Sequence, residues 1–432
     1  MSSSVPSMCA AERRHLDETE DSVISEGMQQ VIIDNNRLLD ELESPDKVIS
    51  LSRLFSLRSV ISTASSFAIF NQSQQGLEMS YQRIGFGQCG LVFTKPGSAH
   101  VVKIARPYFS DALWEDFLSH LRLFKALSLH SDTQCRIPRV YSYINKENTV
   151  WWDANTALLP PNSDFPLPSQ ALITERILPL PKIIRHALID QFCPEALRES
   201  AKASPLNNDC LARMYLGRRR TPNAPPTPNF SLRNFNFCLD QMLELGLPVQ
   251  DYAREMAACL AILHWHARMD GFDIEFVLGS DAELSYTTHV AQSLGMDVEQ
   301  LEKLPKHSDI EVLQRLNFQR RVVRLWVLDF NLCNRFPMDD AFIVEHEKEI
   351  LSQLVLAFFE NDPYYPLPLM EMNVDRQLWS IFRQEYEKKA VEILSASEAL
   401  KHLPLKFLDA CVEREQRNLE KGLGHGHRDF KG

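Results

Sequence analysis

The spacing of apolar residues changes along the chain and separates an N-terminal extension from the rest. Apolar residues recur at helical spacing from Val23 to Leu42, and a second helical stretch begins at Pro45. Residues 1–22 are polar and charged, a composition typical of disorder, and residues 59–75 are rich in serine and glutamine. The pattern therefore predicts an extension over residues 1–75 that is partly disordered and carries helices.

From Tyr81 onward the spacing shortens to that of strands, which predicts a small β-rich lobe over residues 76–180. One helix, expected over residues 112–129, interrupts the strands. The expected strands cover residues 81–85, 90–94, 100–105, 139–143, 148–152 and 171–177, with the fourth and fifth forming a hairpin.

Helical spacing dominates after Pro181, so residues 181–432 are expected to form a helical C-terminal lobe. Within it, residues 280–320 are expected to be an insertion built from a pair of helices, and the glycine- and histidine-rich tail from Lys421 is expected to be flexible. The fold class that follows is α+β: a bilobal arrangement with a small β-rich N-terminal lobe, a helical C-terminal lobe and an N-terminal helical extension.

Composition narrows the function classes. The 432 residues carry a net charge of −11, so the chain lacks the basic surplus of proteins that grip nucleic acid through phosphates. No apolar run approaches the roughly 20 residues that span a bilayer, and the N-terminus does not resemble a signal peptide. We therefore expect an intracellular protein, cytoplasmic or nuclear, with no membrane span and no nucleic-acid partner.

Three glycines, Gly85, Gly87 and Gly90, fall in the pattern G-x-G-x-x-G, and Val92 follows two residues later. Glycines at this spacing let backbone N–H groups approach phosphate oxygens with no side chain between them. In dinucleotide-binding folds the last glycine opens a helix, whereas here it opens the strand that contains Val92. The motif predicts a phosphate-binding loop, with an ordinary glycine-containing hairpin as the alternative.

Lys103 follows the apolar pair Val101-Val102 on the next expected strand. A lysine on the buried side of a strand is costly unless it is paired, and Glu115 on the following helix is the nearest candidate partner. We therefore expect Lys103 to hold phosphate and Glu115 to pair with it. The alternatives are an exposed strand lysine and a solvated glutamate.

Asp270 and Glu275 lie five residues apart, directly before the apolar residues 276–278. The spacing matches the loop H-R-D-x-x-x-x-N, in which the Asp acts on an acceptor hydroxyl and the Asn binds a metal ion. Asp270 is therefore the candidate catalytic residue. Glu275 is a candidate metal ligand because a carboxylate can hold Mg²⁺. Arg268-Met269 replaces His-Arg, and a surface turn is the alternative.

Asp329 follows the apolar strand expected over residues 323–328, in a segment that matches D-F-G with Asn331 in place of the glycine. An aspartate at this position would bridge Mg²⁺ to nucleotide phosphates. Asparagine tolerates a left-handed backbone better than most residues, so the replacement is a mild one. The alternative is an unrelated aspartate at the end of a strand.

His264 and His266 form a His-x-His pair on an expected helix. Helix positions two apart point away from each other, so packing and helix-end capping are favoured over a metal site. The tail histidines, His425 and His427, are expected to be flexible, and the arginines at 218–220 are expected to be solvated rather than bound to phosphate or to an acidic partner.

Six segments of the chain carry a resemblance to a known family: residues 211–220, 230–235, 239–242, 263–265, 270–279 and 328–331. Together they resemble a fungal family, the domain of unknown function 3669, whose members often carry the label "zinc finger protein". The resemblance covers roughly residues 81–394 and implies no function. The sequence contains no C-x-x-C pair and no H-x-x-x-H, so it does not support the zinc label.

The order of glycine loop, Lys103, Asp270 and Asp329 also bears a more distant resemblance to the protein-kinase-like fold. That resemblance implies ATP and Mg²⁺ as cofactors. Three classes follow: a divergent phosphotransferase, a pseudokinase or scaffold that works through protein contacts, and, ranked last, a zinc-dependent nucleic-acid binder. The replaced motif residues favour the second class, and the retained lysine and aspartates favour the first. The partner, an unknown protein or small-molecule acceptor, is not given by the sequence.

Overall fold

The computed structural model describes residues 80–429 except for residue 97 and residues 162–165, 222–229 and 285–315. Before residue 80 it describes only residues 31–33, 51, 52, 54, 55, 57 and 59–62. Among the described residues, no helix is long and apolar enough to cross a membrane.

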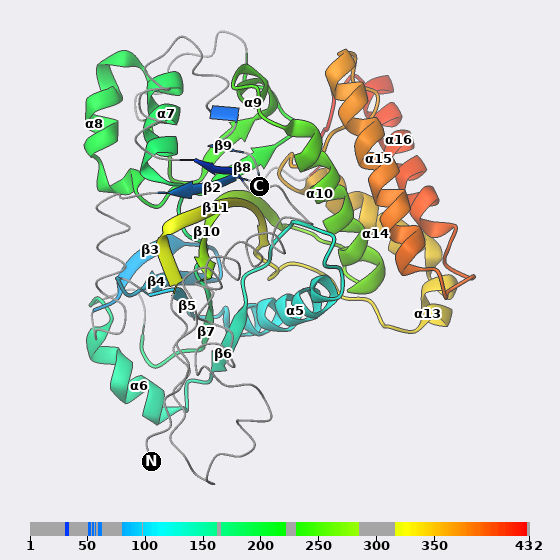
Figure 1. The fold of residues 1–432 in the computed structure, drawn as a ribbon. Helices are drawn as coiled ribbons and strands as arrows, with labels where there is room; N and C mark the ends of the chain where they lie inside the picture. The colour runs from blue at the N-terminus through cyan, green and yellow to red at the C-terminus, as the bar shows by residue number, and fades with distance from the viewer. Residues whose placement is uncertain are drawn as a thin grey trace, which may run out of the picture.

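An antiparallel sheet of five strands forms the N-terminal lobe (Figure 1). Its strands, in spatial order, are β3 (Gln82–Phe86), β4 (Gly90–Thr94), β5 (His100–Ala105), β7 (Ala171–Glu175) and β6 (Val140–Ile144). Helix α5 (Ser110–Ser128) follows β5, as the sequence predicted to within two residues. Alternate residues of a strand point to opposite faces, so Val102 and Ile104 enter the core while Lys103 faces the other way.

The prediction of a hairpin from residues 139–143 and 148–152 is wrong for its second strand. Residues Thr149–Asn155 form helix α6, and β6 pairs with β7 instead. The side chain of Asn148 caps this helix by accepting a hydrogen bond from the Trp151 N–H at 3.0 Å. Trp152 is buried in the core of the lobe, so tertiary packing holds the segment helical.

A second sheet of six strands lies beside the first lobe. Its strands, in spatial order, are β1 (Val31–Ile33), β2 (Ser59–Ser62), β11 (Leu316–Leu328), β10 (Glu275–Leu284), β8 (Ala212–Tyr215) and β9 (Phe235–Cys238). The prediction of a helix through residues 31–33 is therefore wrong, and the serine- and glutamine-rich stretch begins with a strand. The expected insertion begins and ends as strands, and its centre, residues 285–315, lies outside the described residues.

Helices make up most of the remaining described chain, as expected. They are α7 (Lys182–Phe192), α8 (Arg198–Ala203), α9 (Leu239–Glu244), α10 (Val249–Ala261), α13 (Asp340–Glu345), α14 (Glu347–Glu360), α15 (Asn373–Ile393) and α16 (Leu403–Glu420). Short turns of 3₁₀-helix cover Thr156–Leu158, Glu195–Leu197 and Pro205–Asn207, and a π-helical turn, Ile262–His266, ends α10. Figure 1 shows α10 and α14 to α16 stacked together on one side of the six-stranded sheet.

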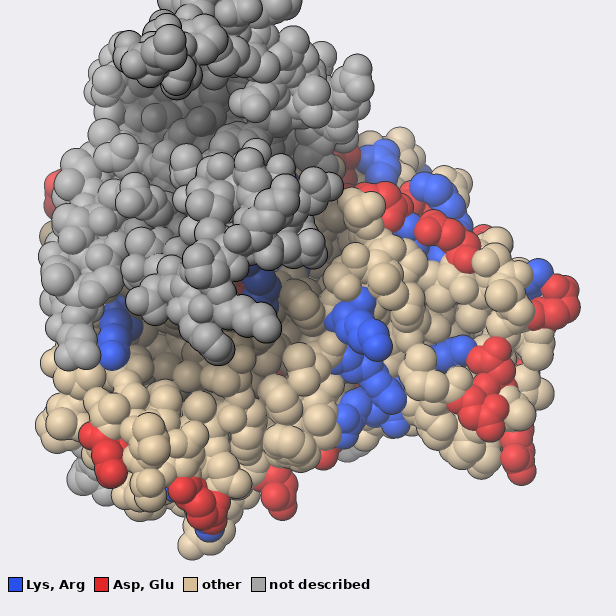
Figure 2. Space-filling view, turned by 60° about the horizontal axis from the view of Figure 1, so that its bottom comes forward, with Lys and Arg blue, Asp and Glu red and all other residues tan. Residues whose placement is uncertain are grey.

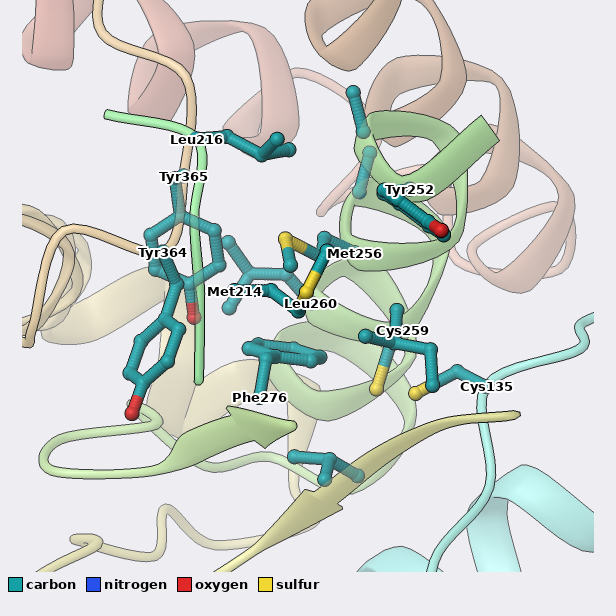
Figure 3. Close-up of a cluster of buried hydrophobic side chains, with 14 of the residues drawn as sticks. Cys135, Met214, Leu216, Tyr252, Met256, Cys259, Leu260, Phe276, Tyr364 and Tyr365 are labelled. Carbon is teal, nitrogen blue, oxygen red and sulfur yellow. The ribbon is translucent and has the colours of Figure 1, made fainter. Parts of the chain in front are cut away.

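One large apolar core joins the helices to the second sheet. Phe276 of β10 and Met214 of β8 pack against Met256 and Leu260 of α10 (Figure 3). Three side chains of α5, Leu123, Ala126 and Leu127, belong to the same core. Helix α5 is thus anchored to the helical lobe as well as to its own sheet. The packing of these three side chains fixes the position of α5, so that its first turns face the space between the lobes.

The C-terminal tail differs from the expectation of a flexible end over its described residues. The His425 ring contacts the buried Glu415 carboxylate at 2.8 Å, and the Gly426 N–H donates to the same group at 3.0 Å. Arg428 then donates to the Asn361 carbonyl at 3.1 Å and to Asp362 at 2.9 Å. The tail therefore returns to the centre of the molecule (Figure 1).

Candidate functional site

A cleft of about 770 Å³ lies between the two sheets. The N-terminal lobe contributes the glycine loop, and β11 and the loop before β10 contribute residues from the other side. Its size suits a small-molecule ligand. Its lining includes Gly85, Gly87, Gly90, Val92, Lys103, Asp116, Arg213, Arg233, Asp273, Glu275, Asp329 and Asn331.

The glycine loop has the shape that the sequence predicted, a tight turn between β3 and β4. The Gly87 N–H donates to the Gly90 carbonyl at 2.9 Å and closes the turn. A Cβ at Gly90 would lie 2.8 Å from the Ile104 carbonyl oxygen, and one at Gly85 would lie 2.9 Å from the Cβ of Val92. A Cβ at Gly87 would meet nothing closer than 3.6 Å. Gly85 and Gly90 are therefore needed for packing, whereas Gly87 is not.

Lys103 is the centre of an ionic group that links three elements. Its Nζ lies 2.7 Å from Asp116 Oδ2 on α5 and 3.1 Å from Asp329 Oδ1 after β11. Burial alone would lower the pKa of Lys103, but the two carboxylates outweigh it and hold that pKa well above its ordinary value. The lysine is therefore charged at neutral pH and faces the cleft as a fixed cation.

The predicted pairing of Lys103 with Glu115 is wrong by one residue. Asp116, the next residue, takes that place, and it is buried while Glu115 is about half exposed. Neighbouring helix positions are about 100° apart, so only one of the two side chains can face Lys103. Glu115 instead contacts Arg335 beyond the cleft.

Asp116 also fixes the segment that begins at Asp329. Its second oxygen, Oδ1, accepts a hydrogen bond from the Phe330 N–H at 3.1 Å. The Phe330 side chain is fully buried, and Asp329 has a left-handed backbone, with φ at 65°. Asp329 thereby turns its carboxylate toward the cleft, where its side chain is 32% exposed.

Asp270 does not line the cleft, contrary to the expectation for a catalytic base. Its side chain is buried, and its two oxygens accept hydrogen bonds from the Phe272 N–H at 3.0 Å, the Asn334 N–H at 2.9 Å, the Asn334 amide at 2.6 Å and the Gln353 amide at 3.2 Å. Burial raises the pKa of Asp270, and these hydrogen bonds act against that rise. The carboxylate holds together the loop that carries Asp273 and the loop after Asp329.

Asp273, three residues on, faces the cleft in its place. Its side chain is exposed, its backbone is left-handed with φ at 63°, and its N–H donates to the Asn361 side chain at 2.5 Å. Burial and the nearby Asp329 and Asp362 raise its pKa. The sequence interpretation missed Asp273 because it matched only the two ends of the motif, Asp270 and Glu275.

Glu275 reaches the cleft but is already paired. The Arg213 guanidinium contacts both Glu275 and Asp362, and Tyr215 donates to Asp362 at 2.7 Å. Burial raises the pKa of Glu275 to about 7; Arg213 opposes this, while Asp329 and other carboxylates add to it. Arg213 lies in a segment that carried the family resemblance but had no assigned role.

A further arginine ties the glycine loop to the helical lobe. Arg233 donates from its Nη2 to the Ile84 carbonyl of β3 at 2.8 Å, across the cleft. The adjacent Asn234 has a left-handed backbone, with φ at 52°. No spacing rule pointed to Arg233, because the contact joins segments that are 149 residues apart in the chain.

Residues 325–398 match the family DUF3669. The model of this family carries the description "Zinc finger protein". The match agrees with the resemblance that the sequence indicated over this segment, which includes Asp329, α14 and α15. Of the six segments that carried the resemblance, it contains residues 328–331.

Among solved structures, the chain is similar to one titled "Structure of the microcompartment-associated aminopropanol kinase". The identity is 11%, 81% of this chain and 97% of that chain are covered, and the TM-score is 0.19, a weak likeness. No curated protein matches the chain.

Two sets of side chains in the described residues have metal-binding chemistry. Asp329, Asp273 and Glu275 offer carboxylate oxygens in the cleft, the donors that Mg²⁺ prefers. The second set is His130, Asp132 and Glu392, whose donor atoms lie within 4.8 Å of one another. There the buried Lys389 ammonium already lies 2.5 Å from Asp132 and 2.8 Å from Glu392. A metal ion would have to displace that cation.

The His-x-His pair is used for packing, as the sequence indicated. The buried His264 ring contacts the Tyr386 hydroxyl at 2.7 Å, and burial lowers its pKa to about 3. His266 faces His130 at 3.0 Å. The two histidines therefore point to different neighbours and share no ligand position.

Proposed function

We propose that the protein is a kinase-like nucleotide-binding protein that takes ATP with Mg²⁺ in the cleft between its lobes. The observation that carries the proposal is the Lys103 ammonium, held between Asp116 and Asp329 directly beside the glycine loop. A fixed cation beside a glycine turn, which a ligand can approach without a side chain in between, is suited to polyphosphate. A carboxylate on the other side of that cation is suited to the accompanying metal ion.

Each group would have a distinct task. The loop around Gly87 would approach the phosphates through its backbone, and Lys103 would pair with their oxygens. Asp329 would hold Mg²⁺, which when bound neutralises phosphate charge and fixes the phosphate geometry. Asp273, and Glu275 once it releases Arg213, are further candidate metal ligands.

Two of the three carboxylates expected to act in phosphotransfer are engaged by protein groups, so we propose a pseudokinase or a divergent phosphotransferase. Asp270 is engaged in four hydrogen bonds, and the Arg213 charge competes with any metal ion at Glu275. The assignment of Asp270 as a catalytic base stays a prediction. The geometry favours Asp273 for that role, because its carboxylate faces the cleft.

An interaction scaffold without nucleotide binding is the alternative. The paired state of Glu275 favours it, since a protein arginine already neutralises one of the candidate metal ligands. Zinc-dependent nucleic-acid binding is ranked last. At the one metal candidate outside the cleft among the described residues, the Lys389 ammonium already pairs with Asp132 and Glu392.

The test is a thermal-shift titration of the full chain with ATP, with and without Mg²⁺. Ligand that binds only the folded state raises its apparent stability by mass action, by about 2.7 kcal/mol at 100 times the Kd. We expect a Mg²⁺-dependent shift in the wild type and in Lys125→Ala, a control on the exposed face of α5. The shift should be absent in Lys103→Ala, and in Asp329→Asn its dependence on Mg²⁺ should be lost.

The absence of any shift at millimolar ATP would overturn the proposal in favour of the scaffold. Metal analysis of the same preparation gives a separate check on the zinc class. Stoichiometric zinc that survives the double variant Asp132→Asn, Glu392→Gln would show a site other than the set formed by His130, Asp132 and Glu392.

A further inference from the structure

A second hollow opens beside the cleft, on the side of α5. It has a volume of about 580 Å³ and lies between α5 and the loop 331–337. Asn331 lines both hollows, so the two are adjacent at the residue that follows the Asp329-Phe330 pair. A ligand in the second hollow would therefore lie next to the phosphate-binding end of the cleft.

Two guanidinium groups face this hollow. Arg122 comes from α5 and Arg335 from the loop. Burial lowers the pKa of Arg122, and the positive charge of Arg335 lowers it further, so the two groups repel each other. Figure 2 shows a group of Lys and Arg side chains near the middle of the face that it displays, with other basic side chains elsewhere on that face.

The charge of this pair is only half compensated. Glu115 contacts Arg335. Arg122 donates to the Phe336 carbonyl at 3.1 Å, and among the described residues it forms no ion pair with a carboxylate. A half-buried guanidinium beside a second one, with one carboxylate paired to the second, leaves an excess positive charge, and each guanidinium has five N–H donors.

We propose that Arg122 and Arg335 form a binding site for the oxyanion of a small molecule, a carboxylate or phosphate group, that occupies the second hollow next to the nucleotide. The inference rests on the proposed function only for its position beside the phosphates. Arginine forks bind carboxylate and phosphate oxygens in pairs, which matches the two donors available here. The polar Asn331, between the two hollows, would face the rest of the ligand.

Glu115 would be displaced or would share Arg335 when the ligand binds. Glu115 thus competes with the ligand for Arg335. A variant that removes its charge should therefore raise the affinity for the oxyanion. Glu115→Gln removes the competing charge but keeps the size of the side chain. Because Glu115 is 46% exposed, the substitution leaves the core intact.

The experiment is calorimetric titration of the full chain with three probes: inorganic phosphate, glycerol 3-phosphate and citrate. Phosphate-bearing and carboxylate-bearing probes distinguish the two sources of oxyanion. We expect millimolar binding of at least one probe, weakened about tenfold or more in the double variant Arg122→Gln, Arg335→Gln. Glu115→Gln should tighten the same probe several-fold, and higher salt should weaken it.

Arg254→Gln is the matched control, an exposed arginine of α10 that lines neither hollow. Equal weakening in this control, or a Glu115→Gln variant that binds no more tightly, would overturn the site. Binding of a polyglutamate peptide with no binding of the three small probes would overturn the small-molecule class.

The ATP titration is run on the same variants so that the two proposals fail separately. Oxyanion binding without an ATP shift would keep this site and overturn the nucleotide site. An ATP shift without oxyanion binding would do the reverse.

Discussion

The two sides of the cleft use their charged residues differently. On the phosphate side, formed by the glycine loop, Lys103, Asp116 and Asp329, the ionic contacts hold Lys103 and Asp329 where they face the cleft. On the transfer side, formed by Asp270, Asp273 and Glu275, protein groups occupy two of the three carboxylates. Lys103 and Asp329 are paired at the cleft wall and can still contact a ligand. The Asp270 carboxylate accepts four hydrogen bonds and could contact a ligand only if these bonds were broken.

Residues that match a motif in sequence differ here in their access to the cleft, so the matches alone do not decide whether the protein is active. Lys103 and Asp329 keep both their positions and their access, so they support binding. Asp270 keeps its position in the motif but has lost its access to the cleft. Binding and transfer are therefore separable properties of this site, and each side can be tested alone.

The largest effect is expected from Asp116→Ala on the phosphate side. The change leaves the buried Phe330 N–H without its acceptor and Lys103 with one carboxylate instead of two. Breaking a buried ion pair costs about 3–5 kcal/mol, measured by urea unfolding, and the ATP shift should be lost. Glu115→Ala, one residue earlier, is the control and should change stability by less than about 1 kcal/mol. Equal losses in both variants would contradict the assignment of Asp116.

Asp270→Asn against Asp273→Asn tests the transfer side. An amide at position 270 would place N–H groups against donors from Phe272, Asn334 and Gln353, so we expect a loss of about 2–3 kcal/mol in unfolding free energy. Asp273 is exposed, and its substitution should leave stability unchanged while weakening Mg²⁺-dependent ATP binding or hydrolysis. A stable Asp270→Asn variant that selectively loses hydrolysis would restore Asp270 as the catalytic residue.

Glu275 gives a pH-dependent prediction. Its pKa rises from 4.5 to about 7 on folding, so the folded state binds this proton more tightly than the unfolded state does. The contribution of the group to stability is therefore present below about pH 4.5 and is lost as the pH rises to about 7. Glu275→Gln should match the wild type near pH 4 and exceed it above pH 8 by on the order of 2 kcal/mol.

The measurement is urea unfolding of both proteins across this pH range. A variant that is less stable than the wild type at pH 8 would show that the Arg213 ion pair outweighs burial. Mg²⁺ needs the ionised carboxylate, so any wild-type Mg²⁺ affinity that depends on Glu275 should rise as the pH passes about 7.

The smallest effects on stability are expected from substitutions in the glycine loop, which test how the phosphate side would bind its ligand. Gly90→Ala places a Cβ 2.8 Å from the Ile104 carbonyl and should cost about 1–2 kcal/mol. Gly87→Ala meets nothing within 3.5 Å and should leave stability unchanged. If the loop binds phosphate through its backbone, Gly87→Ala should still weaken the ATP shift. An unchanged shift would reduce the loop to an ordinary hairpin.

Local patterns predicted the parts of the fold that depend on neighbouring residues. The strands around Gly85 to Gly90 and the helix α5 agree with their expected ranges because alternation and helical spacing are local signals. The segment 149–155 was predicted wrongly. Its two tryptophans favour a strand by propensity, whereas the Asn148 cap and the burial of Trp152 make it a helix.

The sequence by itself determined the order of the glycine loop, Lys103 and Asp329 along the chain. It also determined the apolar strands that flank each of them. Only the tertiary structure decided which carboxylates are used. Lys103 meets Asp329 across 226 residues of chain, and the helix phase of α5 selects Asp116 over Glu115. Burial of Asp270 and the pairing of Glu275 with Arg213 depend on loops whose contacts carry no local signal. Motif spacing gives a residue's position along the chain, whereas access and partners depend on packing between distant segments.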